Sequence, residues 1–458
     1  MIQPSQLTTY SLKTNPSGER ISRILIAALQ AVDPDAAVTR YLRRTGDTLL
    51  VTDRSYDLNK FQHIYVVGAG KAGTPMAQAT VRILEDKLTA GLVIVKEGHV
   101  GNTYPLDSTD VDIIEAGHPI PDQRGFQASN KLIGLVKNAL PDDLIVSLVS
   151  GGGSALLTIP VEGISLAELQ ELTDILLVSG ATIQEINTLR KHLEQLKGGG
   201  LAQLIAPASM ITLILSDVVG NPLDIIASGP TVADSSTFDD ALAILERRQL
   251  VDQVPSSILN HLRRGQDGFI KETPKPGDPV FKNAQNVIIG SNEIAAEAAR
   301  AQAEVEGFNA LLLTTYLEGE AYHIGGTLAA IVRQISATGQ PIPPPACVIA
   351  GGETTVTIRG DGLGGRNQEV ALGAVDGMDG ISNAILVTLA TDGGDGPTDA
   401  AGAVVTGGTR KRAGDLDLLP HDYLTRNDSY NFFEALGDLL ITGPTQTNVN
   451  DLTFLFVT

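Results

Sequence analysis

The spacing of apolar residues alternates between helical repeats and short unbroken apolar runs. From Ser17, the segment GERISRILIAALQAV places apolar residues at helical spacing and predicts an opening amphipathic helix. The run HIYVVGAG, ending at Gly70, predicts a buried strand, and a helix is expected over about 72–87. Beyond it the pattern predicts strands at 92–96, near 113–116, at 143–149 and at 210–215, with helices at about 125–138 and over 165–205.

The alternation stops around residues 250–283 and then resumes. The segment KETPKPGDPVFKN holds three prolines, little apolar content and no periodicity, so we interpret it as a connector. The pattern after it predicts strands at 286–290, 310–315, 347–350, 384–390 and in the final LTFLFVT, with helices at 291–306 and 319–336. This alternation predicts an α/β fold of two domains, 1–250 and 284–458, with a cleft between them. The N-terminal domain is expected to have a mostly parallel sheet with helices on both faces, and the C-terminal one to be a second α/β domain.

Composition narrows the function classes. The 458 residues carry 53 carboxylates against 33 Lys and Arg, a formal charge of -20, which argues against nucleic acid as a partner. The single cysteine, Cys347, cannot form an internal disulfide and is expected to be a buried strand residue. No apolar stretch is long enough to span a membrane, and the first residues do not resemble a signal peptide. We therefore expect a soluble cytoplasmic protein with no membrane partner.

Two glycine-rich turns are candidate anion sites. Gly68-Ala69-Gly70-Lys71-Ala72-Gly73 joins a strand to a helix and is half of a dinucleotide fingerprint, with the third glycine at the wrong spacing. Lys71 would suit a phosphate or carboxylate. The loop Ser150-Gly151-Gly152-Gly153-Ser154 follows another apolar strand, and its bare N–H groups would suit a phosphate. The alternative for each segment is an ordinary tight turn.

A third glycine-rich stretch, GGETTVTIRGDGLGGRNQEVALG, runs from Gly351 to Gly373. Its glycine pair would let backbone amides approach an anion closely, and Arg366 brings a planar fork at the start of a predicted helix. Glu353 and Asn367 lie in the same stretch. In a chain of such negative charge, an arginine placed here is expected to serve a small anionic ligand.

Other polar residues could complete a site. Asn187 and Arg190 fall on one face of a predicted helix that also carries Lys191, with Lys197 before a GGG stop; a solvated helix end is the alternative. Aspartates on glycine-rich loops are typical Mg²⁺ ligands or, alternatively, turn caps. The candidate metal ligands are Asp217, Asp392 and Asp395, with Asp224 and Asp399 on the same loops. His118 sits on a proline-rich loop and could touch a ligand or only its own loop.

Eight segments, taken in order, resemble the glycerate 2-kinases, the glycerate kinases with a C-terminal MOFRL domain. They are VVGAGKAG, EAGHPIPD, SGGGSALL, INTLRKHLEQLKGGGLA, LSDVVGNPLDIIASGPT, GGETTV, GGRNQE and TDGGDGPTDAAGA, and they extend from about residue 20 to the end. The resemblance implies a Rossmann-like N-terminal domain, a MOFRL region over about 345–458, and a site between the domains in which Lys71 and Arg366 match the family's lysine and arginine. One departure is Glu194, where the family pattern leads us to expect a small polar residue.

The activity implied by the resemblance is ATP-dependent phosphorylation of D-glycerate to 2-phosphoglycerate, with Mg²⁺ and with the oligomeric state, such as a homodimer, left open. Loop amides, cations and a metal ion are what phosphoryl transfer requires of a protein. One alternative is an NAD(P)-dependent hydroxypyruvate reductase, which needs an acidic residue about 20 positions beyond the glycine turn to bind the ribose. Glu85, Asp86 and Glu97 are the candidates. The other alternative is a non-catalytic sugar-phosphate or nucleotide-binding regulator.

Overall fold

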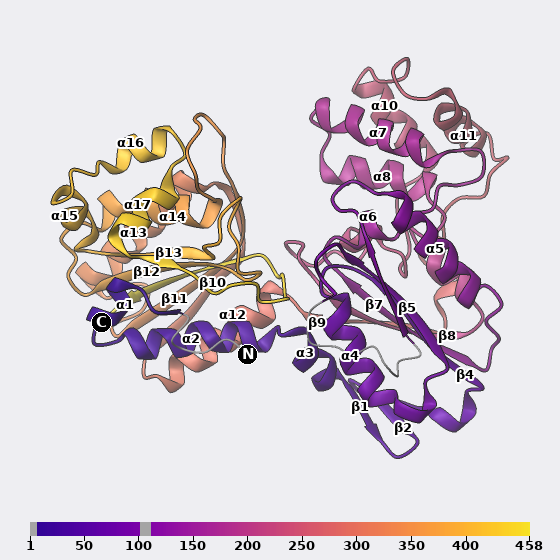
Figure 1. Cartoon of the computed structure of the whole chain (residues 1–458), viewed down its shortest axis with the longest axis horizontal. Helices are drawn as coiled ribbons and strands as arrows, with labels where there is room; N and C mark the ends of the chain where they lie inside the picture. The colour runs from indigo at the N-terminus through magenta and orange to yellow at the C-terminus, as the bar shows by residue number, and fades with distance from the viewer. Residues whose placement is uncertain (1–6, 101–110) are drawn as a thin grey trace. The chain divides into compact units, whose positions relative to one another are not determined.

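The computed structural model describes residues 7–100 and 111–458, and the chain divides into two compact units (Figure 1). We call Pro34–Ile289 the central unit, and Met1–Asp33 together with Gly290–Thr458 the C-terminal unit. This division differs from the predicted 1–250 and 284–458, because the opening helices pack with the C-terminal part of the chain. Periodicity identifies an apolar helix face but not the surface against which it packs.

The central unit is built on a six-stranded sheet, as the strand–helix alternation predicts. Its strand order is β6-β5-β4-β7-β8-β9, and the neighbours from β6 to β8 all pair in parallel. A small antiparallel sheet, β1-β2-β3, precedes it and was not predicted. The strands are β1 Leu42–Thr45, β2 Thr48–Val51, β3 Arg54–Asp57, β4 His63–Ala69, β5 Ala90–Lys96, β6 Val111–Ala116, β7 Asp143–Ser150, β8 Ser209–Leu215 and β9 Ala284–Gly290.

Helices cover both faces of this parallel sheet. Helix α5 (Gln123–Val136) and helix α9 (Gly200–Ile205) share one apolar core with β4, β5 and β7, whereas α4 (Gly73–Leu84) packs on the other face. Burial on two faces explains why β7 is buried at every position and is mostly apolar. The remaining elements of this layer are α3 Pro34–Tyr41, η2 Leu58–Lys60, η3 Glu85–Lys87, α6 Gly153–Leu156 and η4 Ile226–Ser228.

The predicted connector around 250–283 is wrong, because this stretch is folded into the central unit. Helix α11 lies in this stretch and contributes Ile258 and Leu262 to a second apolar cluster of the central unit. The other helices of that cluster are α7, α8 and α10. The proline-rich segment is held by its backbone, since the Asp234 amide donates to the Pro274 carbonyl at 2.9 Å. The elements are α7 Leu166–Val178, α8 Ile183–Leu193, α10 Phe238–Arg247, α11 Ser256–Gln266 and η5 Pro279–Phe281.

The C-terminal unit has a mixed sheet of order β10-β11-β15-β12-β13-β14. Only β10 and β11 pair in parallel; the terminal strand β15 lies antiparallel between β11 and β12. The second α/β domain predicted from the sequence therefore has a mixed sheet, whose strand directions the apolar runs alone do not give. The strands are β10 Asn309–Glu320, β11 Ala346–Thr355, β12 Ala384–Ala390, β13 Gly402–Thr406, β14 Leu439–Leu440 and β15 Asp451–Val457.

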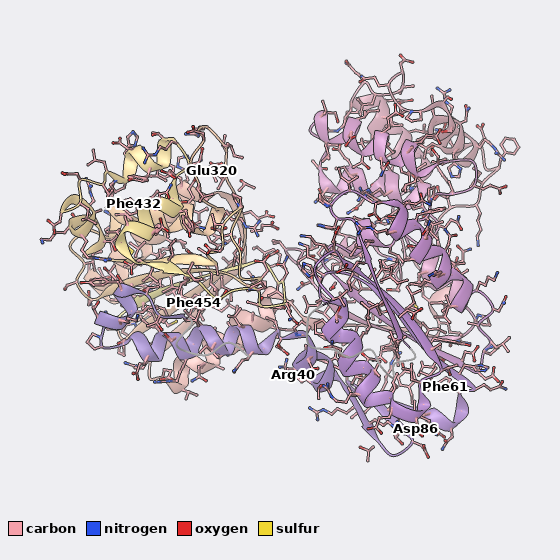
Figure 2. All side chains as sticks on the ribbon, viewed as in Figure 1. Arg40, Phe61, Asp86, Glu320, Phe432 and Phe454 are labelled. Atoms are coloured by element: carbon pink, nitrogen blue, oxygen red, sulfur yellow. The ribbon has the colours of Figure 1, made fainter. Side chains whose placement is uncertain are left out.

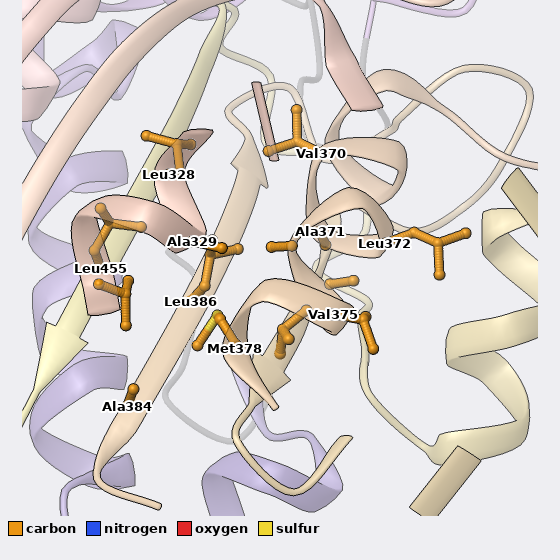
Figure 3. Packing of buried hydrophobic residues seen from close by; sticks show 14 of the residues in the cluster. Leu328, Ala329, Val370, Ala371, Leu372, Val375, Met378, Ala384, Leu386 and Leu455 are labelled. Atoms are coloured by element: carbon orange, nitrogen blue, oxygen red, sulfur yellow. The ribbon is translucent and has the colours of Figure 1, made fainter. Parts of the chain in front are cut away.

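The two faces of this mixed sheet are buried by different helices. Alternate residues of β15 point to opposite sides, as strand geometry requires: Leu455 joins the cluster formed with α13 and α14 (Figure 3), whereas Phe456 contacts Phe308. Figure 2 labels Phe432, in the first of these cores, and Phe454, which stacks on Phe456. The helices are α1 Tyr10–Thr14, α2 Gly18–Ala31, α12 Asn292–Val305, α13 Ala321–Thr338, α14 Arg366–Met378, α15 Thr409–Gly414, α16 Pro420–Thr425 and α17 Ser429–Leu436.

Two expectations about the chain as a whole can be compared with the structure. Cys347 is buried in β11, and burial raises the pKa of its thiol, so it is an inert strand residue as predicted. Across 7–100 and 111–458, none of the helices has both the length and the apolar character needed to cross a membrane.

Candidate functional site

The glycine loop after β7 lies beside the glycine turn after β4, because these parallel strands are neighbours in the sheet. The Ser150 hydroxyl accepts a hydrogen bond from the Ala72 amide at 3.1 Å, and the Gly151 carbonyl accepts one from the Lys71 amide at 2.9 Å. Carboxyl ends of adjacent parallel strands are where open α/β sheets bind ligands. The structure therefore brings together Gly70, Lys71 and the Ser150–Ser154 loop.

A Cβ would clash at two positions of this pair of loops. On Gly70 it would lie 2.0 Å from the Ser150 hydroxyl and 2.6 Å from the Ser150 carbonyl oxygen, so a larger residue would push the two loops apart. On Gly151 it would lie 2.0 Å from Asp217 Oδ2, so a larger residue would displace that side chain. The close approach also places the predicted metal ligand Asp217 directly against the glycine loop.

Cations surround the glycine loop in the central unit. The His118 ring and the Lys71 side chain both face Gly152, whose φ is +81°. Burial, together with the nearby Lys71, Lys96, His99 and Arg190, lowers the pKa of His118 to about 4. A neutral imidazole at physiological pH leaves Lys71 and Arg190 as the cations beside the loop, and the Asp217 carboxylate lies against Gly151. The two cations suit an anion, although the chain as a whole is strongly acidic.

The predicted residues Asn187, Arg190 and Ser154 are linked through a serine that the sequence did not single out. The Arg190 guanidinium donates to the Ser154 hydroxyl at 3.3 Å, and the Ser154 and Ser228 hydroxyls are 2.8 Å apart. Ser228 in turn donates to the Asn187 side-chain oxygen at 2.8 Å. The signal for Ser228 was its position in LSDVVGNPLDIIASGPT, one of the eight family-like segments.

Lys197 is placed as an internal support, not at a surface that a substrate could reach. Its side chain is 1% exposed, and its ammonium donates to the Ser154 carbonyl at 2.7 Å, the Leu157 carbonyl at 2.8 Å and the Glu194 carboxylate at 2.9 Å. An ammonium has three protons, so all are used. This geometry does not support the predicted substrate contact, and it explains why a carboxylate stands at Glu194.

Arg366 begins helix α14 in the C-terminal unit and is held by two carboxylates. Its Nε donates to Asp451 at 2.6 Å, and its Nη1 donates to Glu353 at 2.6 Å. Although burial works against its charge, Asp451 and Glu353 raise the pKa of Arg366 above its usual value. Asp451 was missed from the sequence, because a lone aspartate before an apolar strand carries no signal. The guanidinium keeps other N–H groups for a ligand, but carboxylates dominate its surroundings.

Asp395 caps the start of α14. Its two oxygens accept hydrogen bonds from the amides of Asn367 at 3.1 Å and Gln368 at 2.9 Å, which lack partners within the helix. Burial raises the pKa of Asp395 to about 6, the two amides oppose that shift, and Asp451 adds to it. The predicted ligand residue Asn367 is buried, and its side-chain nitrogen is 3.3 Å from Asp395.

The predicted metal ligands lie in different surroundings. Asp217 lies against the glycine loop of the central unit, whereas Asp392 is an exposed residue of the C-terminal unit that accepts from the Gly394 amide at 3.2 Å. Asp395 uses its oxygens to cap a helix. In the described part of the chain, no three acidic, histidine or cysteine side chains gather as a metal cage. Mg²⁺ needs only one or two protein carboxylates when phosphates and water complete its coordination.

The acidic residues that a reductase would need are also located. Glu85 and Asp86 form η3, at the far end of α4 from the glycine turn, and Asp86 (Figure 2) pairs with Arg44. Glu97 does follow β5 directly, where a ribose-binding carboxylate would stand, but it pairs with Arg124 at 2.9 Å. The strand itself ends in Lys96, a cation.

Known proteins match this chain along nearly its whole length. A family model described as "Domain of unknown function (DUF4147)" matches residues 20–263, and the MOFRL family model matches residues 346–451. The chain is 42% identical to a D-glycerate 2-kinase of Thermotoga maritima, over 94% of this chain and 95% of the relative. It is also 42% identical to a glycerate 2-kinase of Pyrococcus horikoshii, over 95% and 96%. The crystal structure of a glycerate kinase from Thermotoga maritima superposes with a TM-score of 0.84 at 40% identity, over 95% of this chain and 98% of that one.

Proposed function

Because the chain belongs to the glycerate 2-kinase family, we propose that it transfers the γ-phosphoryl group of ATP to the 2-hydroxyl of D-glycerate. The observation that carries the proposal is the full-length match at 42% identity, which includes both family regions. The geometry of the glycine loop supports it, since phosphoryl transfer depends on positioning the reactants and on neutralising phosphoryl oxygens.

We place the phosphate-binding part of the reaction at the Ser150–Ser154 loop. Within the described residues, the Gly151 and Gly152 amides donate to no backbone carbonyl, so they are available to an anion. Lys71 and Arg190 bring positive charge to the same loop. Gly70, Gly153 and Asn187 shape the loop and hold its partners. Lys71 would contact the phosphates or the substrate carboxylate.

Arg366 is proposed to contact the reacting groups. Asp451 and Glu353 fix its guanidinium in one orientation, which leaves the unpaired N–H groups preorganised for charge that develops during transfer. Asn367 follows it on α14. Two firm carboxylate partners also mean that Arg366 is a poor resting site for a free anion, which separates its role from that of Lys71.

Magnesium is proposed to arrive with ATP, and when bound it would neutralise phosphate oxygens. Asp217 is the carboxylate best placed to hold it, because it already lies against the glycine loop. Asp392 remains a weaker proposal, and the contacts of Asp395 support helix capping instead. With a loose transition state, no strong general base is required of these residues.

A coupled assay tests the proposal against the reductase alternative. Purified protein is given D-glycerate and Mg-ATP while ADP release is followed, and in a parallel experiment hydroxypyruvate and NADH while absorbance at the nicotinamide band is followed. We expect ADP release that depends on D-glycerate and no NADH oxidation. The reverse pattern would establish a reductase, and substrate binding with neither turnover would establish a regulator. A homodimer and a cytoplasmic location stay predictions.

A further inference from the structure

Three consecutive residues beside the glycine loop have left-handed backbone conformations. They are Ala227, Ser228 and Gly229, with φ of 50°, 60° and 61°. Glycine tolerates this region, but alanine and serine adopt it only at a cost in free energy. Such residues persist where the surrounding structure fixes them, and they cluster at functional sites. Contacts with the surrounding residues must therefore hold these three residues in place.

The left-handed turn is packed against the glycine loop. A Cβ on Gly153 would lie 3.0 Å from the Ala227 methyl group, and the Ser228 carbonyl accepts from the Gly198 amide at 2.9 Å. The Ser228 side chain is fully buried. Its hydroxyl lies 2.8 Å from Ser154 and 2.8 Å from Asn187. The strained backbone thus places one hydroxyl between two residues of the anion site.

The donor and acceptor of each hydrogen bond between Arg190 and Asn187 can be assigned. The Asn187 side-chain oxygen only accepts, so the Ser228 proton is given to it. Ser228 must then accept the proton of Ser154, because each hydroxyl has one proton to donate. The Ser154 oxygen is left to accept from Arg190. Ser154 therefore presents a lone pair to the guanidinium, and its own proton is not available to a ligand.

We propose that Ser228 is a positioning residue of the anion site, and that it acts through Ser154 on Arg190. The inference rests on the proposed function, in which anionic substrates bind at this loop. By fixing the Ser154 hydroxyl, Ser228 holds one edge of the Arg190 guanidinium beside the loop, and Thr173 accepts from another edge at 3.4 Å. The remaining N–H groups are then oriented toward a phosphate or carboxylate oxygen.

The test variant is Ser228→Gly, which removes the hydroxyl and at the same time removes the cost of a side chain at positive φ. The relief of the backbone cost offsets part of the loss of the two buried hydrogen bonds, so the variant should still fold. Because the lost interaction is made with bound substrate as much as with the transition state, KM for D-glycerate or Mg-ATP should rise about five- to tenfold while kcat changes less than threefold. Ser228→Ala also lacks the hydroxyl but keeps the side chain at positive φ, and its KM should rise by the same factor as that of Ser228→Gly.

Gln249→Gly is the matched control. Gln249 is also a left-handed residue of the central unit, with φ of 58°, but it is exposed at the end of α10 and far in sequence from the anion loop. Relief of the same backbone cost there should leave both KM values unchanged. Circular dichroism and thermal melting of each variant show whether its fold is intact.

A double-mutant cycle with Arg190→Ala decides whether Ser228 acts through the arginine. In the Arg190→Ala background, Ser228→Gly should change KM no further, because the group that it positions is absent. An unchanged KM in folded Ser228→Gly, or effects that multiply in the double variant, would overturn the inference. Wild-type turnover is measured first. If the wild type releases no ADP in response to D-glycerate, the proposed function is wrong. If the wild type is active and Ser228→Gly has normal kinetics, only the positioning role is wrong.

Discussion

Substitution of Lys197 by methionine distinguishes a buried support from a substrate contact. Methionine keeps the length and apolar stem of the lysine but removes its charge and three donors. The Glu194 carboxylate, 3% exposed, would then be left without its cation, and the Ser154 and Leu157 carbonyls would each lose a donor. Burial already lowers the pKa of Lys197, and the Glu194 carboxylate opposes that shift.

The expected cost is large. Removal of one partner from a buried ion pair typically costs about 3–5 kcal/mol, because the other charge stays buried and unpaired. For a domain of this size, each kcal/mol lowers the melting temperature by roughly 2–4 °C. Lys197→Met should therefore melt about 10 °C or more below the wild type. A solvated lysine at a helix end would change stability by no more than about 0.5 kcal/mol.

The assay is thermal melting followed by circular dichroism, with a double variant as the control. Lys197→Met/Glu194→Gln removes both charges, so it should regain at least half of the lost melting temperature. The reasoning would be refuted if Lys197→Met melted like the wild type but bound substrate poorly. That result would return Lys197 to the role of a substrate contact.

Three further predictions concern Arg366, Asp395 and His118. Arg366→Ala should lower kcat and kcat/KM alike by about 10²–10³-fold with an intact fold, and near-normal turnover would end its proposed role. In the Arg366→Ala/Lys71→Ala double variant, a loss of kcat/KM smaller than the product of the two single losses would indicate that both residues act on the same step. Asp395, with a pKa near 6 in the folded protein, binds its proton more tightly there than in the unfolded chain, so the stability it contributes is complete below about pH 4 and is lost as pH rises through 6. The difference in unfolding free energy between wild type and Asp395→Asn should therefore fall by about 2 kcal/mol from pH 4 to 6.5 in denaturant titrations, and a difference that rises with pH would contradict this expectation. The His118 ring should titrate near pH 4 by NMR, whereas a midpoint near 6.5 would show that neither burial nor the nearby cations act on it.

The sequence predicted the elements of the central unit better than their surroundings. Apolar runs located β4, β5, β7 and β8 to within a residue or two, because strands buried on both faces carry few polar positions. The hairpin strands β1–β3 are four residues each, too short for a period to show. Helix α11 was read as part of a connector, although its buried Ile258 and Leu262 stand at helical spacing.

The candidate site was predicted by residue type and only partly by role. Glycine spacing identified both loops; close backbone approach excludes larger residues at Gly70, and the Asp217 carboxylate fills the space beside Gly151. Charge alone could not separate a lysine beside the glycine loop, such as Lys71, from a buried one that supports the loop, such as Lys197. That distinction depends on burial and on three acceptors supplied by distant parts of the chain.

Identification of the phosphorylated product by NMR shows whether the enzyme phosphorylates the 2-hydroxyl of D-glycerate. Wild-type protein is incubated with D-glycerate and Mg-ATP, and ³¹P–¹H coupling shows which carbon carries the phosphate. The account predicts a single product, 2-phosphoglycerate, coupled to the lone C2 proton. Phosphate coupled to the two C3 protons, or ATP left intact beside unreacted glycerate, would contradict it.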